Sequence, residues 1–567
     1  MTSLYIRSAA ATACALASVA LTTPVFAQVA LPSREELDPA RAAPIPAAPR
    51  GDMFDAVERT PCPFTGSDLK FTLRSVEVRG AADGALALSP DDLSPAYARE
   101  IGTEVPVAAV CEIRDRVAAL YLRRGVLASV SIPEQRINEG RLVLQVVEAR
   151  IASVSYHGDA GPAQKQVARY LDQLKGMAPF DLDVAQRYLL LASDIPGVSV
   201  QATLKPAPGA GPGAVTLDIA VSRDAANGSV QVQNYGSKTI GRALGLARAD
   251  FNSFTPLGER TSVIVYWTLD SDEQRVIQAT ESFKLGGSGL AMDLSASWAW
   301  TRPGDAVAPL KLEGESFAGS ARLTYPIVRH RRRNVNLGVG LDWIDQKVEF
   351  GGGIATLTED HLRIFFAKLD GHWAPRALAD RNGAFTGSFE VRRGTTGLDA
   401  SRYGSFTASR FRGRPDSLVW RAEAQGGGRI VGPVLATAAL SWQFTNDPLL
   451  SYEEFSVGNL SVGRGYDPSA ASGDRAVAAS VELTTVPFPL FDGRAAWRPY
   501  AFYDAAKLTN IGPGAGKVSL TSAGVGVRAQ ITPRVNLDLA WAKPFDDPFG
   551  KDKAPPSRLL VSLSALF

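Results

Sequence analysis

Arg464 stands between two glycines in the run VGRGYD, residues 462–467, and its side chain is suited to binding a carboxylate. The planar guanidinium group can donate two parallel hydrogen bonds to one carboxylate, which makes the contact specific as well as strong. Gly463 and Gly465 permit the backbone angles of a tight loop tip. The run therefore predicts an ion pair made by an arginine at the tip of a loop.

Asp504 is the candidate partner, because it follows Phe502 and Tyr503 in a segment whose polarity alternates. Side chains of a strand point alternately to its two faces, so that Phe502 and Asp504 share one face and Tyr503 occupies the other. If one face contacts lipid, the carboxylate is expected on the opposite face. The alternative is that Arg464 is an ordinary exposed arginine and Asp504 an ordinary polar residue.

No set of residues has the spacing of a catalytic or cofactor site. The glycine triplets at 351–353 and 426–428 lack the Lys-Ser/Thr that completes a phosphate-binding loop. The histidines have no nucleophile beside them in the sequence; they are His157, His330, His361 and His372. The basic turn that runs from position 330 to 333 is predicted to be solvated. We predict no enzymatic activity, no metal site and no cofactor, with a barrel enzyme such as a phospholipase or protease as the alternative.

Residues 1–27 have the organisation of a cleavable signal peptide. Arg7 gives a basic start, residues 9–21 are apolar, and VFA at 25–27 is an A-x-A-like cleavage site. The apolar stretch is too short to span a bilayer, and no later apolar run is long enough. The mature chain is therefore predicted to be exported and to lack a membrane-spanning helix.

Cys62 and Cys111 remain after cleavage, because Cys14 leaves with the signal peptide. Neither cysteine has a neighbour at the spacing of metal ligands. An exported chain enters an oxidising compartment, in which a cysteine pair forms a disulfide. We therefore predict a Cys62–Cys111 disulfide.

The second half of the chain consists of segments that alternate apolar and polar residues. The final segment places five apolar side chains on one face: Leu559, Val561, Leu563, Ala565 and Phe567. From residue 228 to 567 the pattern predicts about sixteen antiparallel strands, with short turns on one side and long loops on the other. This is the pattern of an outer-membrane β-barrel with lipid outside and water inside. The balance of 60 basic against 58 acidic residues argues against a nucleic-acid partner.

Residues 69–149 and 150–223 are predicted to be tandem α+β modules, each with the order strand, helix, helix, strand, strand. Residues 28–68 precede them as a linker rich in Pro and Ala. Within this linker, residues 33–43 are predicted to form about three turns of helix with Ser33 as the N-cap. A disordered tail is the alternative for this segment.

Several motifs in the modules resemble one family. The first module contains YLRRG at 121–125, IPEQRI at 132–137 and GRL at 140–142, and the second contains LLLASDIPGV at 189–198. Together they resemble the paired POTRA domains of two-partner secretion transporters of the ShlB/FhaC/HecB type, which belong to the BamA-like superfamily. The resemblance covers nearly all of the mature chain.

The resemblance also implies roles for the residues considered first. Arg464, Gly465 and Tyr466 match the tip of the loop that folds back into the barrel, and Phe502 with Asp504 matches the strand motif that receives it. Ala506 departs from the family, which usually has Gly there. This change leaves the expected pair of Arg464 and Asp504 intact.

The implied function is secretion of a large exoprotein, of the haemolysin secretion/activation type. POTRA domains in the periplasm would capture the unfolded client, which is of the TpsA type, and the barrel would conduct it across the outer membrane. Further implied partners are outer-membrane lipid and the barrel assembly machinery, the latter through Phe567. The alternatives are a BamA-like assembly factor, which typically carries more POTRA domains, and a passive porin-like channel, which would leave the N-terminal modules unexplained.

Overall fold

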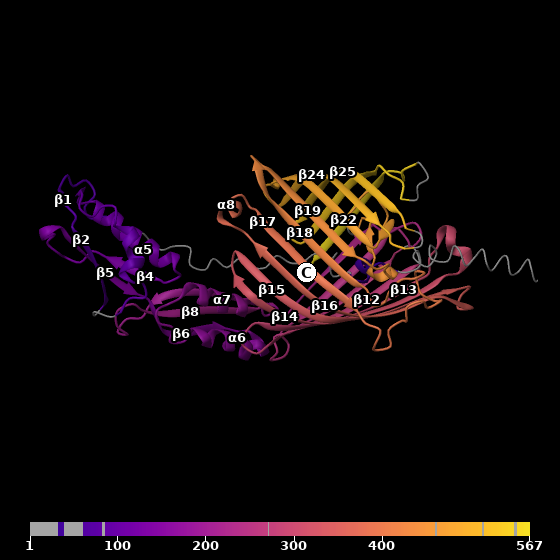
Figure 1. Cartoon of the computed structure of the whole chain (residues 1–567), viewed down its shortest axis with the longest axis horizontal. Helices are drawn as coiled ribbons and strands as arrows, with labels where there is room; N and C mark the ends of the chain where they lie inside the picture. The colour runs from indigo at the N-terminus through magenta and orange to yellow at the C-terminus, as the bar shows by residue number, and fades with distance from the viewer. Residues whose placement is uncertain are drawn as a thin grey trace, which may run out of the picture.

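The computed structural model describes residues 32–38, 61–81, 85–269, 272–459, 462–512, 515–548 and 553–567. The predicted signal peptide lies outside these residues. In the described part of the chain, no helix is both long and apolar enough to cross a bilayer. The N-terminal modules lie at one end of a large β-barrel (Figure 1).

Sixteen antiparallel strands close the barrel within the described ranges, in agreement with the sequence prediction, if β22 and β23 are taken as one interrupted strand. The strands follow one another around the barrel in chain order, and β27 closes on β9. Their bounds are β9 Ala226–Gln233, β10 Leu244–Asn252, β11 Arg260–Thr268, β12 Gln274–Leu285, β13 Leu290–Thr301, β14 Glu313–His330, β15 Arg333–Phe350, β16 Ala355–Trp373, β17 Ala384–Gly394, β18 Leu418–Val431, β19 Val434–Thr445, β22 Arg475–Thr485, β23 Phe488–Leu490, β24 Ala495–Thr509, β25 Lys517–Thr532, β26 Val535–Pro544 and β27 Arg558–Leu566.

The connections between strands differ between the two ends of the barrel, as the sequence predicts. Turns at 286–289, 432–433 and 533–534 are short, and they lie at the same end as the N-terminal modules. Loops at 395–417 and 446–474 are long and lie at the opposite end. Short periplasmic turns and long outer loops are typical of outer-membrane barrels.

The first module is built on the mixed sheet β2-β5-β4, in which β2 (Ser75–Gly80) is parallel to β5 (Arg141–Glu148) and β4 (Ala128–Ser131) is antiparallel to it. A small ladder of β1 (Lys70–Thr72) and β3 (Glu104–Pro106) precedes the long helix. The helices are α4 (Pro90–Leu93) and α5 (Ala109–Arg123). Helix α5 buries an apolar face against the sheet, which includes Val110, Ile113, Val117 and Tyr121.

The second module repeats this arrangement. Strand β6 (Arg150–Gly158) is parallel to β8 (Ala214–Arg223), and β7 (Val198–Pro206) is antiparallel to it. Helices α6 (Gln164–Leu171) and α7 (Leu182–Ser193) cover the sheet. The same pairing pattern in two successive modules agrees with the internal repeat predicted from the sequence.

The predicted disulfide is present between Cys62 and Cys111, and it joins the segment before β1 to helix α5. The cysteines are 49 residues apart in the sequence. Closing a loop of this length in the unfolded chain corresponds to a stabilisation of about 4 kcal/mol in the chain-entropy model.

We therefore expect thiol labelling of the mature, denatured and unreduced protein to find no free cysteine, and labelling after reduction to find both. The reduced sample is the control for accessibility of the thiols to the reagent. Labelling of both thiols without reduction would contradict the disulfide.

The helix predicted at 33–43 is present but short. Helix α3 spans Arg34–Leu37, and Ser33 caps it through a capping box with Glu36, as its position predicts. The helix ends at Asp38, because this residue precedes Pro39 and a proline disfavours helical geometry in the residue before it. The prediction of a helix that continues beyond Leu37 is therefore wrong, and residues 39–43 of the predicted helix lie outside the described residues.

Helix α3 lies inside the barrel. Leu37 is 2% exposed and shares an apolar cluster with Leu244, Ile264 and Val276 of the inner wall. The Asp38 carboxylate accepts a hydrogen bond of 3.1 Å from the Gln278 amide on β12. A segment from before the first module is thus packed in the lumen.

The second module packs directly on the periplasmic end of the barrel. Arg329 at the end of β14 donates two hydrogen bonds of 2.6 Å to the carboxylate of Asp194, which caps the end of α7. The Arg187 guanidinium of α7 donates a hydrogen bond of 3.1 Å to the carbonyl of Pro326. These contacts fix the module beneath the strands β12 to β15.

The basic turn after β14 takes part in this contact. The Nε2 atom of His330 lies 3.5 Å from a carboxylate oxygen of Asp183, and the backbone N–H of Arg331 donates to the side-chain oxygen of Gln186 at 3.4 Å. The prediction of a solvated turn therefore missed the contact with α7. Sequence alternation gives no information on which turn faces a neighbouring domain.

Candidate functional site

The loop at 446–474 folds back into the barrel instead of extending from it. It contains the short hairpin β20 (Phe455–Val457) and β21 (Ala471–Gly473), and residues 462–467 form its tip. The hairpin packs on buried residues of β22, β24 and β25, among them Ala476, Leu508 and Leu520. The tip therefore reaches the inner wall formed by these strands.

Arg464 and Asp504 are in direct contact. The Nε atom of Arg464 lies 3.0 Å from one carboxylate oxygen of Asp504 and Nη2 lies 2.8 Å from the other, while the backbone N–H of Arg464 donates to Asp504 at 2.9 Å. Nη1 donates to Glu482 at 2.7 Å, and Nη2 also donates to Ser480 at 3.0 Å. The guanidinium carbon lies 3.6 Å from the ring centroid of Phe502, a cation–π distance.

The alternation predicted for β24 places these groups correctly. Phe502 and Asp504 are 5% and 1% exposed on the inner face, whereas Tyr503 between them is 50% exposed on the outer face. The pair is therefore largely removed from water. Loss of one partner from a buried ion pair costs about 3–5 kcal/mol, because the other charge stays buried without compensation.

The contacts continue across neighbouring strands. Arg528 of β25 donates a hydrogen bond of 3.0 Å to Glu482, and its Nε donates to Asp538 of β26 at 3.1 Å. The Tyr500 hydroxyl donates to Asp538 at 2.7 Å, and the Arg528 guanidinium lies 3.9 Å from the Tyr500 ring centroid. Opposite charges thus alternate from the loop tip across the inner wall.

Sequence reasoning did not identify Ser480, Glu482, Arg528 or Asp538. The register of the sheet pairs Ser480 with Asp504 and Glu482 with Phe502. Both residues lie at inward positions of the predicted strand before β24, so aligning the two predicted strands would have indicated them.

The glycines flanking Arg464 allow the loop to pack closely. Gly463 has a φ of +107°, a backbone angle that side chains disfavour. A Cβ atom at Gly465 would lie 2.8 Å from both the Pro544 nitrogen and the Ser522 Cβ. Gly465 is therefore needed for close approach of the loop tip to β25 and β26.

Tyr466 is 1% exposed and fixes the far side of the tip. Its hydroxyl donates to the backbone carbonyl of Thr521 at 2.9 Å and also accepts from the N–H of Asp546 at 3.1 Å. Arg558 of β27 donates to the Tyr466 carbonyl at 2.8 Å and pairs with Asp467 at 2.7 Å. The three predicted tip residues, Arg464, Gly465 and Tyr466, thus each contact the barrel wall.

A second buried ion cluster holds the N-terminal part of the loop. Arg392 of β17 donates two hydrogen bonds of 3.0 Å to the Glu453 carboxylate and one of 2.7 Å to Asp342 of β15. Arg421 of β18 donates to the Glu453 carboxylate at 3.2 Å. The loop is therefore held to two separate parts of the inner wall, β15 to β18 and β22 to β25.

Arg410 joins this loop to its neighbours at the outer mouth of the barrel. It belongs to the loop at 395–417, and it pairs with Glu454 at 2.8 Å and with Asp474 at 2.5 Å. It also donates to the carbonyl of Ile511 in the next outer loop, at 2.9 Å. No signal in the sequence indicated this contact, because loops have no periodicity.

Within the described ranges, no group of three or more His, Cys, Asp and Glu side chains is arranged to hold a metal ion. The site consists of ion pairs, hydrogen bonds and aromatic contacts between a loop and a wall. Such an arrangement can hold the loop in place and release it, but it contains no nucleophile with a general base.

Two family profiles match the sequence. "Haemolysin secretion/activation protein ShlB/FhaC/HecB" matches residues 213–529, and "POTRA domain, ShlB-type" matches residues 71–149. No curated protein matches the sequence.

Solved structures share the fold at low sequence identity. CdiB from Escherichia coli is 18% identical with a TM-score of 0.70, over 90% of this chain and 93% of that chain. CdiB from Acinetobacter baumannii is 15% identical with a TM-score of 0.64, over 96% and 99% of the two chains. BamA from Haemophilus ducreyi, lacking POTRA domains 1–3, is 12% identical with a TM-score of 0.52, over 88% and 100%.

Proposed function

This chain belongs to the haemolysin secretion/activation protein family ShlB/FhaC/HecB, whose profile matches more than half of it, and we propose how its parts divide the work of secretion. It is an outer-membrane transporter of the two-partner secretion type, with POTRA domains in the periplasm and a partner exoprotein of the TpsA type as its client. We divide it into a linker with a plug helix at 28–68, POTRA domains at 69–149 and 150–223, and a barrel at 228–567.

The loop at 446–474 is the gate of this transporter in our proposal. The observation that carries it is the contact of Arg464 with Asp504, in which a loop arginine makes both a bidentate side-chain contact and a backbone contact with one inward carboxylate. The loop occupies the lumen, so in our proposal the client passes beside it, and the docked position of the loop keeps this passage open, whereas a released loop obstructs it. Loss of Arg464 or of Asp504 is expected to lower secretion while the barrel still assembles.

The POTRA domains capture the unfolded client. Strands β4 and β7 lie at the edges of their sheets, with one strand partner each among the described residues. An extended polypeptide can add to such an edge through backbone hydrogen bonds, which tolerate many sequences. The contact of α7 with the barrel then holds the second domain next to the lumen into which the client passes.

Helix α3 closes the resting lumen as a plug. We expect Leu37→Glu to displace it, because the buried Leu37 side chain contributes about 1.5–3 kcal/mol and its replacement places a charge against the apolar cluster. Conductance of single proteins in a planar bilayer should show open events at least roughly tenfold more often than in the unchanged protein.

Leu257→Glu is the matched control, because Leu257 is 50% exposed in a turn of the barrel and its replacement should leave the conductance unchanged. Equal conductance of Leu37→Glu and the unchanged protein would contradict the plug.

Two further partners follow from the barrel surface. The outward residues of the strands, such as Tyr503, contact outer-membrane lipid. Phe567 provides the signal for the barrel assembly machinery, and its exposed ring at the closing strand supports this role. In the folded barrel the backbone N–H of Phe567 donates to the carbonyl of Gly228 at 3.0 Å. The assembly machinery would therefore bind Phe567 before β27 pairs with β9 and closes the barrel.

A further inference from the structure

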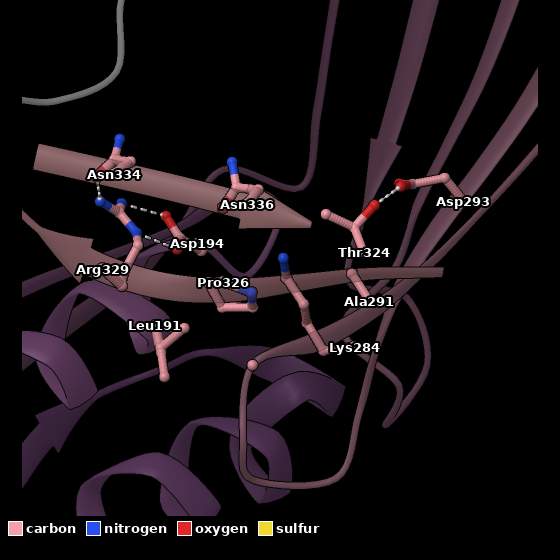
Figure 2. Close-up of a pocket in the computed structure, with 11 residues that line it drawn as sticks. Leu191, Asp194, Lys284, Ala291, Asp293, Thr324, Pro326, Arg329, Asn334 and Asn336 are labelled. Atoms are coloured by element: carbon pink, nitrogen blue, oxygen red, sulfur yellow. Dashed lines mark hydrogen bonds and ion pairs between the residues drawn. The ribbon is translucent and has the colours of Figure 1, made fainter. Parts of the chain in front are cut away.

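A cavity of about 260 Å³ lies where the second POTRA domain meets the periplasmic end of the barrel. Leu191 and Asp194 at the end of α7 form its floor, and residues of β12 to β15 form its walls. Figure 2 shows polar side chains from both parts of the protein, among them Lys284, Arg329 and Asn336, around this space. The cavity is therefore shared between the POTRA domain and the lumen.

The carboxylates of the cavity are already paired. Asp194 accepts the two hydrogen bonds of 2.6 Å from Arg329. Asp293 accepts from Arg322 at 3.1 Å and from the Thr324 hydroxyl at 3.2 Å. Each acidic group thus has a basic partner other than Lys284.

Lys284 makes no hydrogen bond or ion pair with any residue that the structure describes, although the charges of Asp194 and Asp293 attract it from a longer distance. It is half-buried, and its side chain extends between the Asp194–Arg329 pair and the Asp293–Thr324 contact (Figure 2). An ammonium group carries three donors and is strongly hydrated, so a half-buried one whose donors have no direct acceptor is unfavourable unless a ligand or water satisfies them. The geometry leaves a positive charge available to a ligand in this cavity.

The cavity shares one lining residue with the lumenal space beside α3. Asp293 also lines a larger cavity of about 460 Å³, whose wall includes Leu37 and Asp38 of the α3 segment. Both cavities are lined by the inward side chains of β12 to β15. Lys284 therefore lies toward the periplasmic end of the inner wall that also lines the cavity beside α3.

We propose that Lys284 forms a subsite for carboxylate side chains of the client, at the point where its extended chain passes from the second POTRA domain into the lumen. The inference rests on the proposed secretion function and adds a chemical preference to it. The cavity accommodates one acidic side chain, and in an extended chain every second side chain faces the same way, so alternate Asp or Glu residues would reach Lys284 in turn. Binding at this point favours entry of acidic segments.

The test measures binding of fluorescein-labelled peptides to the full-length protein in detergent by fluorescence anisotropy. One peptide alternates Glu and Ser, and the other has Gln at each Glu position. The unchanged protein should bind the Glu peptide roughly tenfold more tightly, as one charge-assisted hydrogen bond would provide. Lys284→Gln should remove this preference, and Lys284→Arg should retain it.

Lys368→Gln is the matched control, because Lys368 is also an inward lysine but has Glu390 3.9 Å away. Equal loss of the preference for the Glu peptide in the Lys368 and Lys284 variants would overturn the proposal. It would indicate that the overall electrostatic potential of the lumen, and not Lys284 itself, attracts the acidic peptide. Retained preference in Lys284→Gln would overturn it as well. Inorganic phosphate that competes as strongly as the Glu peptide would instead indicate a small-anion site, not a client subsite.

Failure of the subsite can be told apart from failure of the secretion function. The subsite is scored by peptide preference in the intact protein, whereas secretion is scored by the amount of exoprotein outside the cell. A protein that secretes normally but has no preference for the Glu peptide overturns the subsite and leaves the transporter in place.

Discussion

Arg464→Ala is expected to reduce secretion of the partner exoprotein by roughly 100-fold or more, while the barrel still assembles. The substitution leaves the Asp504 carboxylate, which is 1% exposed, without its bidentate partner. A cost of about 3–5 kcal/mol for the unpaired buried charge corresponds to a shift of at least two orders of magnitude between docked and released loop. Immunoblots of culture medium measure secretion, and heat-modifiable migration of the outer-membrane protein measures assembly.

Three variants test whether the effect belongs to the pair. Asp504→Ala should lower secretion to the same extent, and the double variant should be scarcely worse than either, because residues that act as a pair are not additive. Arg464→Lys should also lower secretion substantially, because an ammonium group cannot make the bidentate contact with the carboxylate. Losses that multiply in the double variant would show that Arg464 and Asp504 act separately.

Arg498→Ala is the control for loss of a lumenal arginine. Arg498 lies on the same inward row of β24 as Asp504, but it is exposed and has no ion pair in the part of the chain that the structure describes. Its replacement should leave secretion within the range of the unchanged protein. A loss equal to that of Arg464→Ala would indicate that lumenal charge in general, and not the docked loop, governs secretion.

Deletion of residues 69–222 is the second change with a large expected effect. It removes both POTRA domains, and with them the sheet edges and the contact of Asp194 with Arg329. We expect secretion to fall below detection while a heat-modifiable barrel remains in the outer membrane, because the barrel strands form their own closed hydrogen-bond ladder.

The same deletion separates the transporter from its alternatives. Secretion that survives it would favour a simple pore. Normal secretion together with poor insertion of other outer-membrane barrels would favour an assembly factor. Asp194→Ala with Arg329→Ala is the milder companion variant, since it retains both domains and removes the ion pair between domain and barrel.

The barrel could be predicted in detail because the polarity of its side chains alternates along every strand. In a strand with one face in lipid and one in water, each residue type carries information about its side, and the short turns between strands are visible as breaks. The same periodicity placed Phe502 and Asp504 inward and Tyr503 outward. The resemblance of the VGRGYD run to a family motif added the loop partner, which no periodicity provides.

The contacts that the sequence did not reveal join segments that are far apart in the chain and meet only in the folded protein. Glu482 joins the loop tip only because β22 lies beside β24, and Arg329 meets Asp194 only because α7 lies below β14. The short helix was a different failure, since Pro39 was overlooked as a stop signal for the residue before it. The contacts between distant segments can be predicted only if the neighbouring elements are first aligned in space. The end of the helix could have been predicted from the effect of a proline on the residue before it.

The contacts of Arg410 have a consequence for observing this protein in living cells. This arginine ties the surface loop at 395–417 to the loop inside the lumen through Glu454 and Asp474. Phe406 of the same surface loop is fully exposed to the medium. An antibody or a fluorescent label placed there would report the position of the inner loop to an observer outside the cell, without any reagent that must cross the membrane.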